Sequence, residues 1–316
     1  MPDPASTPLI EVDGIFAKIE CVHPAGSVKD RIAQYILRSA EDSGQLRPGM
    51  RIVEATSGNT GIAVAYYGKR MGYAVTIVMP EHMTEERKAL IRGLGAELIL
   101  VSKEGSFAEA VEVRDRIAQD PDVYCVDQFA NPLNVECHER TTGAEILLYL
   151  KGRRPDAFVA GVGTGGTLMG IGRAFRQANP EVWLAAVEPA EAAVMTGGPN
   201  GPHGIFGIGD GFLPPIVLGD DGALHPMIDE AIVVSTDEAM TAATDLRERF
   251  NLCVGVSSGA NFAAAQRLKG VHDTVVTVFA DGYSKYSSHG LRRCEPGACP
   301  FEALCPEPIP ARTGIN

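Results

Sequence analysis

The chain has 316 residues, a formal net charge of −12 at pH 7, 45% hydrophobic and 22% charged residues. This length favours two domains or one large α/β unit, and the composition is ordinary for a globular protein. The negative charge argues against nucleic-acid binding, because such a surface cannot neutralise phosphates. We find no basic-then-apolar leader and no apolar run of membrane-spanning length, so we expect a cytoplasmic protein that makes no membrane contact.

Strands and helices are predicted to alternate along most of the chain. In chain order, we expect extended segments or strands at residues 7–10, 15–21, 51–54, 74–79, 97–101, 123–126, 157–162, 183–188, 231–235 and 274–279. Helices are expected at residues 29–44, 62–71, 84–95, 107–118, 142–150, 167–178 and 237–250, and one opens near residue 257. This alternation is typical of βαβ units and predicts an α/β fold with mostly parallel sheets.

Lys29 follows a Pro-Ala-Gly-Ser turn and precedes a predicted amphipathic helix, in which Ile32, Ile36 and Leu37 recur at helical spacing. A lysine at a helix N-terminus is easier to keep neutral, because the helix dipole disfavours a positive charge there. Schiff-base chemistry requires such a neutral amine. From these residues alone, Lys29 is either a candidate Schiff-base lysine or an ordinary lysine in a first helical turn.

A glycine-rich loop, Gly163-Thr164-Gly165-Gly166-Thr167, follows a predicted strand and opens a predicted helix. The backbone N–H groups of such a loop can converge on a phosphate, its hydroxyls can add hydrogen bonds, and the helix dipole favours negative charge. The loop is not a P-loop, because the Gly-Lys-Ser/Thr ending is absent. A tight βα turn without a ligand is the alternative interpretation.

Two further small polar loops open helices. Thr56-Ser57-Gly58-Asn59-Thr60 offers hydroxyl, amide and backbone N–H donors for a carboxylate or a ring oxygen. Ser257-Ser258-Gly259 offers a hydroxyl for a neutral ring nitrogen. Either loop could instead be a capped helix start. Ligands of open parallel sheets bind beyond the carboxyl ends of the strands, so the three loops together predict a ligand site.

Five motifs occur in a fixed order, namely residues 24–31, 56–61, 128–132, 163–167 and 257–260. In this order and spacing the chain resembles, over residues 7–288, the cysteine synthase/cystathionine β-synthase family of fold type II pyridoxal-phosphate (PLP) enzymes. The resemblance implies PLP as cofactor, a homodimer, and two three-layer αβα domains in a tryptophan synthase β-like fold. It implies a smaller mobile domain at residues 35–144, a larger cofactor-binding domain at residues 1–34 plus 145–292, and an irregular Cys/Pro-rich tail at residues 293–316.

The resemblance also implies a role for individual residues. Lys29 would form the Schiff base with PLP and act as the catalytic acid and base. The remaining cofactor contacts would be Asn59 at the ring oxygen, Gly163, Thr164, Gly165, Gly166 and Thr167 at the phosphate, and Ser257 at the pyridine nitrogen. The substrate would be bound by Thr56, Ser57, Gly58, Thr60 and Gln128 at its carboxylate and by Gly207 and Asp210 at the site entrance.

The reaction implied by the resemblance is β-replacement on an activated serine. O-acetyl-L-serine and sulfide would give L-cysteine and acetate through an aminoacrylate, with Lys29 removing and returning the α-proton. A cystathionine β-synthase-type condensation, cysteine desulfhydration and another β-substituted alanine synthesis stay open as alternatives. A catalytically silent regulatory homologue is a further alternative, and the intact Lys29 argues against it.

The chain departs from the family pattern at three single positions and in the stretch at residues 280–286, where a Pro-containing sequence is usual. His23 stands where Asn is usual, and Ala55 stands where Pro is usual. Neither is expected to touch the chemistry, although His23 could be a pH sensor instead of a structural histidine. Asp210 stands where a small residue is common. Its carboxylate would repel an anionic leaving group such as phosphate, so O-phosphoserine is disfavoured as the donor.

The seven cysteines fall into two groups. Those in apolar segments are expected to be small core residues, namely Cys21, Cys125, Cys137 and Cys253. The tail carries Cys294, Cys299 and Cys305, which could hold zinc or an iron–sulfur cluster with His289 as a fourth ligand. Their spacing is not that of common zinc sites, so we predict no metal and interpret them as free or redox-active thiols.

Overall fold

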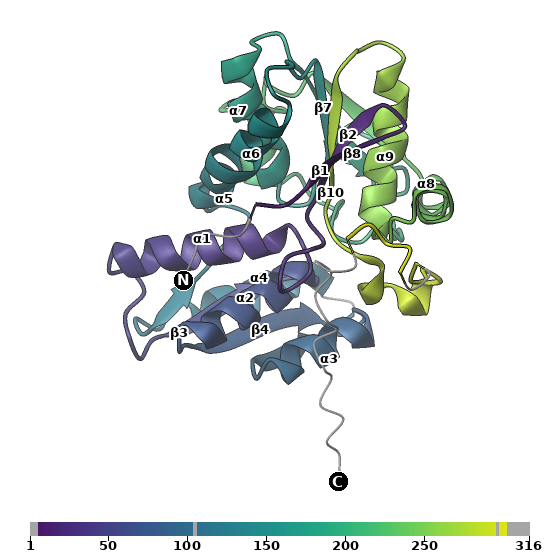
Figure 1. The fold of residues 1–316 in the computed structure, drawn as a ribbon. Coiled ribbons are helices and arrows are strands. Elements are labelled where there is room, and N and C mark those ends of the chain that lie inside the picture. Colours follow the sequence, from purple (N-terminus) through teal and green to yellow (C-terminus); the bar gives the residue numbers. More distant parts are fainter. Residues whose placement is uncertain (1–5, 104–105, 295–296, 302–316) are drawn as a thin grey trace. The chain divides into compact units, whose positions relative to one another are not determined.

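Residues 6–103, 106–294 and 297–301 are described in the computed structural model of the chain. They form two compact units, one running from His23 to Gln128 and the other combining the residues up to Val22 with those from Phe129 onward. Each unit is built on its own sheet of mostly parallel strands with flanking helices (Figure 1). The predicted α/β class is therefore confirmed.

The unit from His23 to Gln128 contains a four-stranded parallel sheet in the order β5-β4-β3-β6. Its strands are β3 (Arg51–Ala55), β4 (Ala74–Pro80), β5 (Glu97–Val101) and β6 (Val123–Cys125), and its helices are α1 (Lys29–Asp42), α2 (Asn59–Arg70), α3 (Glu85–Gly93) and α4 (Ser106–Ile117). Right-handed crossovers place α2 and α3 on one face and α4 on the other, because the chain reverses direction across the sheet after β5. This reversal puts β6 beside β3, so the segments after both strands meet at one edge.

The second unit contains a six-stranded sheet in the order β1-β2-β10-β7-β8-β9, parallel except for the β1–β2 pair. Its strands are β1 (Leu9–Val12), β2 (Ile15–Ile19), β7 (Ala157–Gly161), β8 (Trp183–Pro189), β9 (Glu230–Val234) and β10 (Val275–Phe279). Its longer helices are α7 (Gly166–Ala178) on one side of the sheet and α8 (Thr236–Phe250) and α9 (Val256–Lys269) on the other (Figure 1). Short 3₁₀ turns lie at Pro215–Val217, Tyr283–Lys285 and Ser287–His289.

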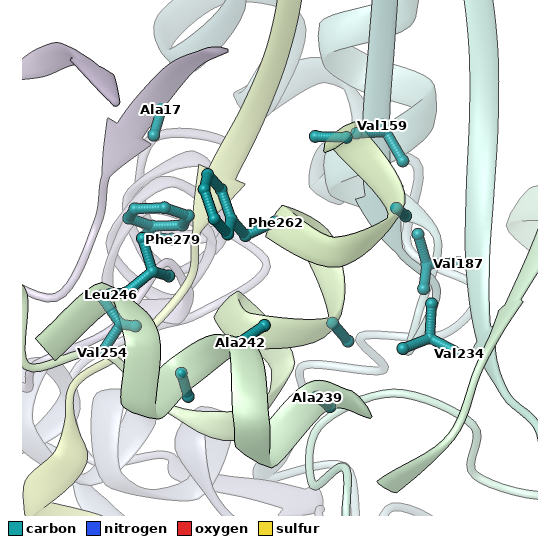
Figure 2. Close-up of a cluster of buried hydrophobic side chains, with 14 of the residues drawn as sticks. Ala17, Val159, Val187, Val234, Ala239, Ala242, Leu246, Val254, Phe262 and Phe279 are labelled. Atoms are coloured by element: carbon teal, nitrogen blue, oxygen red, sulfur yellow. The ribbon is translucent and has the colours of Figure 1, made fainter. Parts of the chain in front are cut away.

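A hydrophobic core fills the space between this six-stranded sheet and the α8–α9 pair (Figure 2). Val159, Val187 and Val234 come from strands, and each is at least 95% buried. The opposing small and large side chains Ala239, Leu246 and Phe262 come from α8 and α9. Burial of these side chains fixes where α9 begins, and α9 carries Ser257.

Most predicted elements are found within two residues of their expected bounds. Thr84 caps α3 as expected, since its side chain accepts a hydrogen bond from the Arg87 backbone N–H. The helix predicted at residues 142–150 is wrong at its start. Helix α5 already begins at Pro132 and continues through a π-helical segment, His138–Gly143, into α6 (Ala144–Tyr149). The missed start signal is Asn131, which caps α5 ahead of a proline at the first helical position.

Both predicted domain boundaries, at residues 34/35 and 144/145, differ from the boundaries of the two units, which lie at residues 22/23 and 128/129. The boundary at residues 34/35 falls inside α1, which runs unbroken from Lys29 to Asp42. Residues 129–144 group with the six-stranded sheet, because α5 and the π-helical segment pack against α7. The mobility of a smaller domain stays a prediction. No helix in the described part of the chain combines the length and apolar character needed to cross a bilayer.

Candidate functional site

Two predicted substrate-binding residues, Thr60 and Gln128, lie in direct contact. The Thr60 hydroxyl donates to Gln128 Oε1 over 2.6 Å, and Gln128 Nε2 donates to the Ala55 carbonyl over 3.2 Å. Both side chains are almost fully buried. They meet because α2, which begins with Asn59 and Thr60, and the segment with Gln128 follow the neighbouring parallel strands β3 and β6. This edge therefore offers a hydroxyl and an amide in a fixed arrangement.

The buried carboxylate of Glu54 holds the backbone next to the Thr60–Gln128 pair. Glu54 Oε2 accepts the backbone N–H of Gln128 at 3.0 Å, and Oε1 accepts that of Ala55 at 2.7 Å. Arg114 Nη1 lies 3.7 Å from Glu54 Oε1 and also binds Asp127. Burial raises the pKa of Glu54 to about 7, against the lowering effect of Arg114 and the two backbone hydrogen bonds. Sequence reasoning missed Glu54, because an acidic residue inside a strand carries no local motif.

The loop after β3 is packed too tightly for side chains at its glycines. The Thr56 hydroxyl accepts the Gly58 backbone N–H at 3.0 Å. A Cβ on Gly58 would collide with the side chain of Arg87, a buried residue of α3. The loop ends where α2 begins, with Asn59 as the first helical residue. Arg87 therefore places a guanidinium against the predicted carboxylate-binding loop, and nothing in the local sequence of α3 signals this.

Lys29 is the first residue of α1 and is half-buried. The turn before it is held by the fully buried carboxylate of Asp30, which accepts the backbone N–H of Ala25 at 2.7 Å and of Ser27 at 3.2 Å. Tyr67 of α2 donates its hydroxyl to the same carboxylate over 3.3 Å. Lys29 is thus presented from a rigid turn at a helix N-terminus, as predicted. His23 is 97% buried in this turn, which favours its structural interpretation.

The predicted phosphate loop connects β7 to α7. Gly165 has φ +84°, a conformation that L side chains rarely adopt. A Cβ on Gly163 would collide with the carbonyl oxygen of Gly207. Thr164 Oγ1 accepts the Gly166 backbone N–H at 3.3 Å and the Asn134 side-chain amide at 3.0 Å. The loop is therefore a close-packed backbone turn.

His138 is a supporting residue that sequence reasoning missed. It is fully buried in the π-helical segment, with Nδ1 2.9 Å from Thr142 Oγ1 and Nε2 3.2 Å from Thr167 Oγ1. Because one ring nitrogen of a neutral imidazole donates and the other accepts, His138 can fix the Thr167 hydroxyl. Such π-helical insertions are frequent at functional sites, and here the insertion aims a histidine at the predicted phosphate loop.

The donors of this loop fit a phosphate group. Helix α7 has 13 residues, and its first turn carries no acidic side chain. Its first backbone N–H groups lack helical partners, and the helix dipole adds positive potential at the same end. The hydroxyls of Thr164 and Thr167, each held by a buried side chain, add two polar contacts. A dianionic phosphate is the ligand that such a donor set prefers.

Ser257 and the Gly207–Gly211 segment lie in the same unit as the phosphate loop. Ser257 is buried in the first turn of α9. Four residues later, Asn261 Oδ1 accepts the backbone N–H of Gly161 at 2.7 Å, which ties α9 to the end of β7. The Gly209 backbone N–H donates to the Val162 carbonyl over 3.0 Å. Gly207 therefore lies beside the start of the loop, since its carbonyl oxygen faces Gly163, and Asp210, three residues later, is half-buried.

A family model described as "Pyridoxal-phosphate dependent enzyme" matches residues 2–281. The chain belongs to this family. The fit of the phosphate loop and the placement of Lys29 agree with that membership, and PLP is the cofactor of this enzyme. A catalytically silent homologue is therefore set aside.

The relatives of this PLP enzyme support β-replacement in the broad sense as its reaction class. A cysteine synthase of Staphylococcus aureus is 40% identical over 281 residues, which cover 88% of each chain. A hydrogen sulfide-producing enzyme of Fusobacterium nucleatum superposes with a TM-score of 0.84 at 40% identity, covering 92% of this chain and 90% of that one. An O-acetylserine dependent cystathionine β-synthase of Helicobacter pylori gives a TM-score of 0.85 at 33% identity, covering 92% and 96%.

The cysteines of the PLP enzyme are arranged differently from the prediction. Cys253 is not a simple core residue, because it forms a disulfide with Cys294 of the tail. Cys299 is a half-buried free thiol, and Cys305 lies outside the described residues. Among the described residues, no group of three or more His, Cys, Asp or Glu side chains could hold a metal ion. The candidate metal ligand Cys294 is thus paired with a residue that the sequence alone did not connect to it.

Proposed function

We propose that this chain catalyses β-replacement on an activated serine, converting O-acetyl-L-serine and sulfide to L-cysteine and acetate. The observation that carries the proposal is the 40% identity to a cysteine synthase across 88% of both chains. The site residues support it, because a rigidly presented lysine, a carboxylate-binding edge and a phosphate loop are the parts that this reaction needs.

The cofactor would be held by Lys29, by Asn59 at its ring oxygen, by the Gly163–Thr167 backbone and hydroxyls at its phosphate, and by Ser257 at its ring nitrogen. When bound, PLP acidifies the α-proton of an attached amino acid by withdrawing electrons from Cα. The Ser257 hydroxyl can donate a hydrogen bond to a neutral ring nitrogen, whereas a carboxylate there would keep the ring nitrogen protonated. Ser257 therefore favours the milder electron withdrawal that suits β-elimination and replacement.

The other residues would orient the substrate and move its proton. Thr56, Ser57, Gly58, Thr60 and Gln128 would bind the substrate carboxylate through hydroxyl, amide and backbone donors. The Lys29 amine would take the α-proton while acetate leaves from Cβ. After sulfide bonds to Cβ, Lys29 would return the proton to Cα, so that its amine is regenerated. Gly207 and Asp210 would line the entrance, where the Asp210 carboxylate disfavours a phosphate leaving group.

Two related reactions are favoured as second candidates by the solved structures. One neighbour is named for producing hydrogen sulfide and another for making cystathionine from O-acetylserine. Both would use the same lysine, carboxylate-binding edge and phosphate loop. They differ from the lead proposal in the donor or in the nucleophile.

A substrate matrix tests the proposal. O-acetylserine, serine, O-phosphoserine and cysteine are each offered as donors with sulfide, thiosulfate or homocysteine, and amino-acid products and released sulfide are quantified. We expect O-acetylserine with sulfide to be among the fastest pairs and O-phosphoserine to be the poorest donor. If sulfide release from cysteine or cystathionine formation exceeds cysteine formation at every concentration, the lead proposal is wrong. Lys29→Ala serves as the inactive control.

Assembly and location are part of the proposal. The family resemblance supports a homodimer and a cytoplasmic location. Light scattering of the purified holoenzyme would give twice the 33.6 kDa chain mass for a dimer. A mass equal to one chain across the micromolar range would contradict the assembly.

A further inference from the structure

The Cys253–Cys294 disulfide fastens the tail to the segment that leads into α9. The two Cα atoms are 5.7 Å apart, at the usual separation for disulfides, and 41 positions separate the residues along the chain. Cys253 lies three residues before Val256, the first residue of α9. Disulfides in reducing compartments are mostly transient and catalytic or redox-sensing. A lasting structural role is therefore not the expected one for this pair at the proposed cytoplasmic location.

Both redox states of the pair find hydrogen-bond partners in the same local backbone. The backbone N–H of Cys294 points at Cys253 Sγ, with N and S 2.6 Å apart. This donor would stabilise a Cys253 thiolate after reduction. Cys294 Sγ lies 3.1 Å from the Asn251 carbonyl oxygen, which would accept a hydrogen bond from the released thiol. The segment therefore accommodates the dithiol and the disulfide without exchanging partners.

A cavity of about 280 Å³ is lined by one cysteine of the pair. The half-buried Cys253 lines this cavity, whereas Cys294 is 95% buried and does not. Arg247 of α8 and Arg292 of the tail also line it, and the single lining carboxylate, Glu248, is bound to Arg247 over 2.9 Å. The cavity therefore holds a net positive charge beside the half-buried Cys253, which favours an anionic ligand.

We propose that this cavity is a docking site for a small carboxylate-bearing thiol that reversibly reduces the Cys253–Cys294 disulfide. The thiolate of the small thiol attacks Cys253 Sγ, and the bond between the two cysteine sulfurs breaks. Cys294 leaves as a thiolate, which takes a proton from water. A second small thiol then attacks the mixed disulfide at the sulfur of the first small thiol, and Cys253 is released. The products are the protein dithiol and the oxidised small disulfide, and the reverse sequence re-forms the protein disulfide. The site does not depend on the proposed β-replacement activity.

The test compares two thiols that differ in charge. Air-oxidised holoenzyme is treated with 3-mercaptopropionate or with 2-mercaptoethanol at equal thiolate concentration, and alkylated Cys253 and Cys294 peptides are followed by mass spectrometry. We expect an oxidised Cys253–Cys294 cross-linked peptide that persists in Cys299→Ser. We expect the anionic thiol to reduce it about 2- to 5-fold faster, which corresponds to one exposed charge pair, and this advantage to shrink in high salt.

Matched arginine variants locate the effect. Arg292→Gln should bring the rate ratio of the two thiols close to one. Arg249→Gln should leave the ratio unchanged, because Arg249 lies on the same helix α8, stacks over Phe250 and does not line the cavity. Recovery of Cys253 and Cys294 only as unlinked peptides from oxidised protein would overturn the disulfide. Equal rates for the two wild-type reactions, or an equal change in both variants, would overturn the docking site.

Discussion

The Thr60 hydroxyl donates a 2.6 Å hydrogen bond to Gln128 Oε1 across 68 positions of sequence. Two motifs that look independent in the sequence therefore form one polar edge. The contact depends on β6 pairing with β3, and the Gln128 backbone is held in turn by Glu54. A substrate carboxylate bound at this edge would find the Gln128 amide already oriented by Thr60, so little ordering is needed on binding.

Removal of the Thr60 hydroxyl tests this edge. Thr60→Val keeps the shape but removes the donor to Gln128 Oε1, so the Gln128 amide that would donate to the substrate carboxylate is no longer held in place. A hydrogen bond to a charged group contributes about 1.5–3 kcal/mol, so KM for O-acetylserine should rise about 10- to 100-fold. Steady-state kinetics measure this, and Thr60→Ser should recover most of the wild-type KM. A KM within twofold of wild type in Thr60→Val would remove Thr60 from the carboxylate site.

Asp30 should control both the stability and the chemistry of the Lys29 turn. Asp30→Ala removes the acceptor for the Ala25 and Ser27 backbone N–H groups and leaves buried donors unsatisfied. We expect a loss of about 1–3 kcal/mol in the free energy of unfolding. Urea denaturation measures that loss, and borohydride reduction in the presence of PLP measures how much Lys29 is trapped on the cofactor.

Asp30→Asn is the matched variant, because it keeps one carbonyl acceptor of nearly the same shape. It should fall between wild type and Asp30→Ala in both measurements. If Asp30→Ala unfolds at the same urea concentration as wild type and traps cofactor equally well, the turn does not depend on this carboxylate.

The parts of the site predicted from the sequence are those encoded locally. Strand-to-helix junctions at Thr56–Thr60 and Gly163–Thr167 carry their signal within a few residues, and the structure places both where parallel strands end. The turn before Lys29 and the Thr84 cap are local for the same reason. Hydrophobic periodicity then suffices to place the flanking helices and the class of fold.

The supporting residues could not be predicted, because their partners are distant in sequence. Glu54 reaches Gln128 across 74 positions, and Cys253 reaches Cys294 across 41. His138 lies in a π-helical segment that follows the helix starting at Pro132, and such a segment has no reliable sequence signal. Each of these side chains is selected by the packing of two elements and not by its own neighbours in the chain.

Gly163 should be irreplaceable in the phosphate loop. In Gly163→Ala the new methyl group would collide with the Gly207 carbonyl oxygen, a backbone atom that cannot turn aside. The loop must shift, so the backbone N–H groups lose their alignment, and we expect PLP affinity of the apoenzyme to fall at least about tenfold. Absorbance titration with PLP measures this. Gly270→Ala is the matched control, because its φ is −72° and the nearest atom lies 4.0 Å from the added carbon. Equal PLP affinity in both variants would contradict the role of Gly163.

Glu54 should make stability fall as pH rises through a defined window. Its pKa is about 7 in the folded protein and 4.5 when unperturbed, so between these values the folded state holds more protons than the unfolded state. The free energy of unfolding should therefore decrease by up to about 3 kcal/mol between pH 4.5 and pH 7 through this group. Glu54→Gln cannot titrate, and its stability relative to wild type should rise over the same window.

Urea denaturation at pH 5, 6, 7 and 8 measures that difference. Glu238→Gln provides the control, because backbone hydrogen bonding in the α8 cap lowers the pKa of Glu238 below 4.5. Glu238 is therefore ionised in the folded and the unfolded state above pH 5. The difference in the free energy of unfolding between Glu238→Gln and wild type should not change with pH. If the difference in the free energy of unfolding between Glu54→Gln and wild type is also independent of pH, Glu54 is already ionised at pH 5. In that case Arg114, 3.7 Å away, outweighs the effect of burial on this carboxylate.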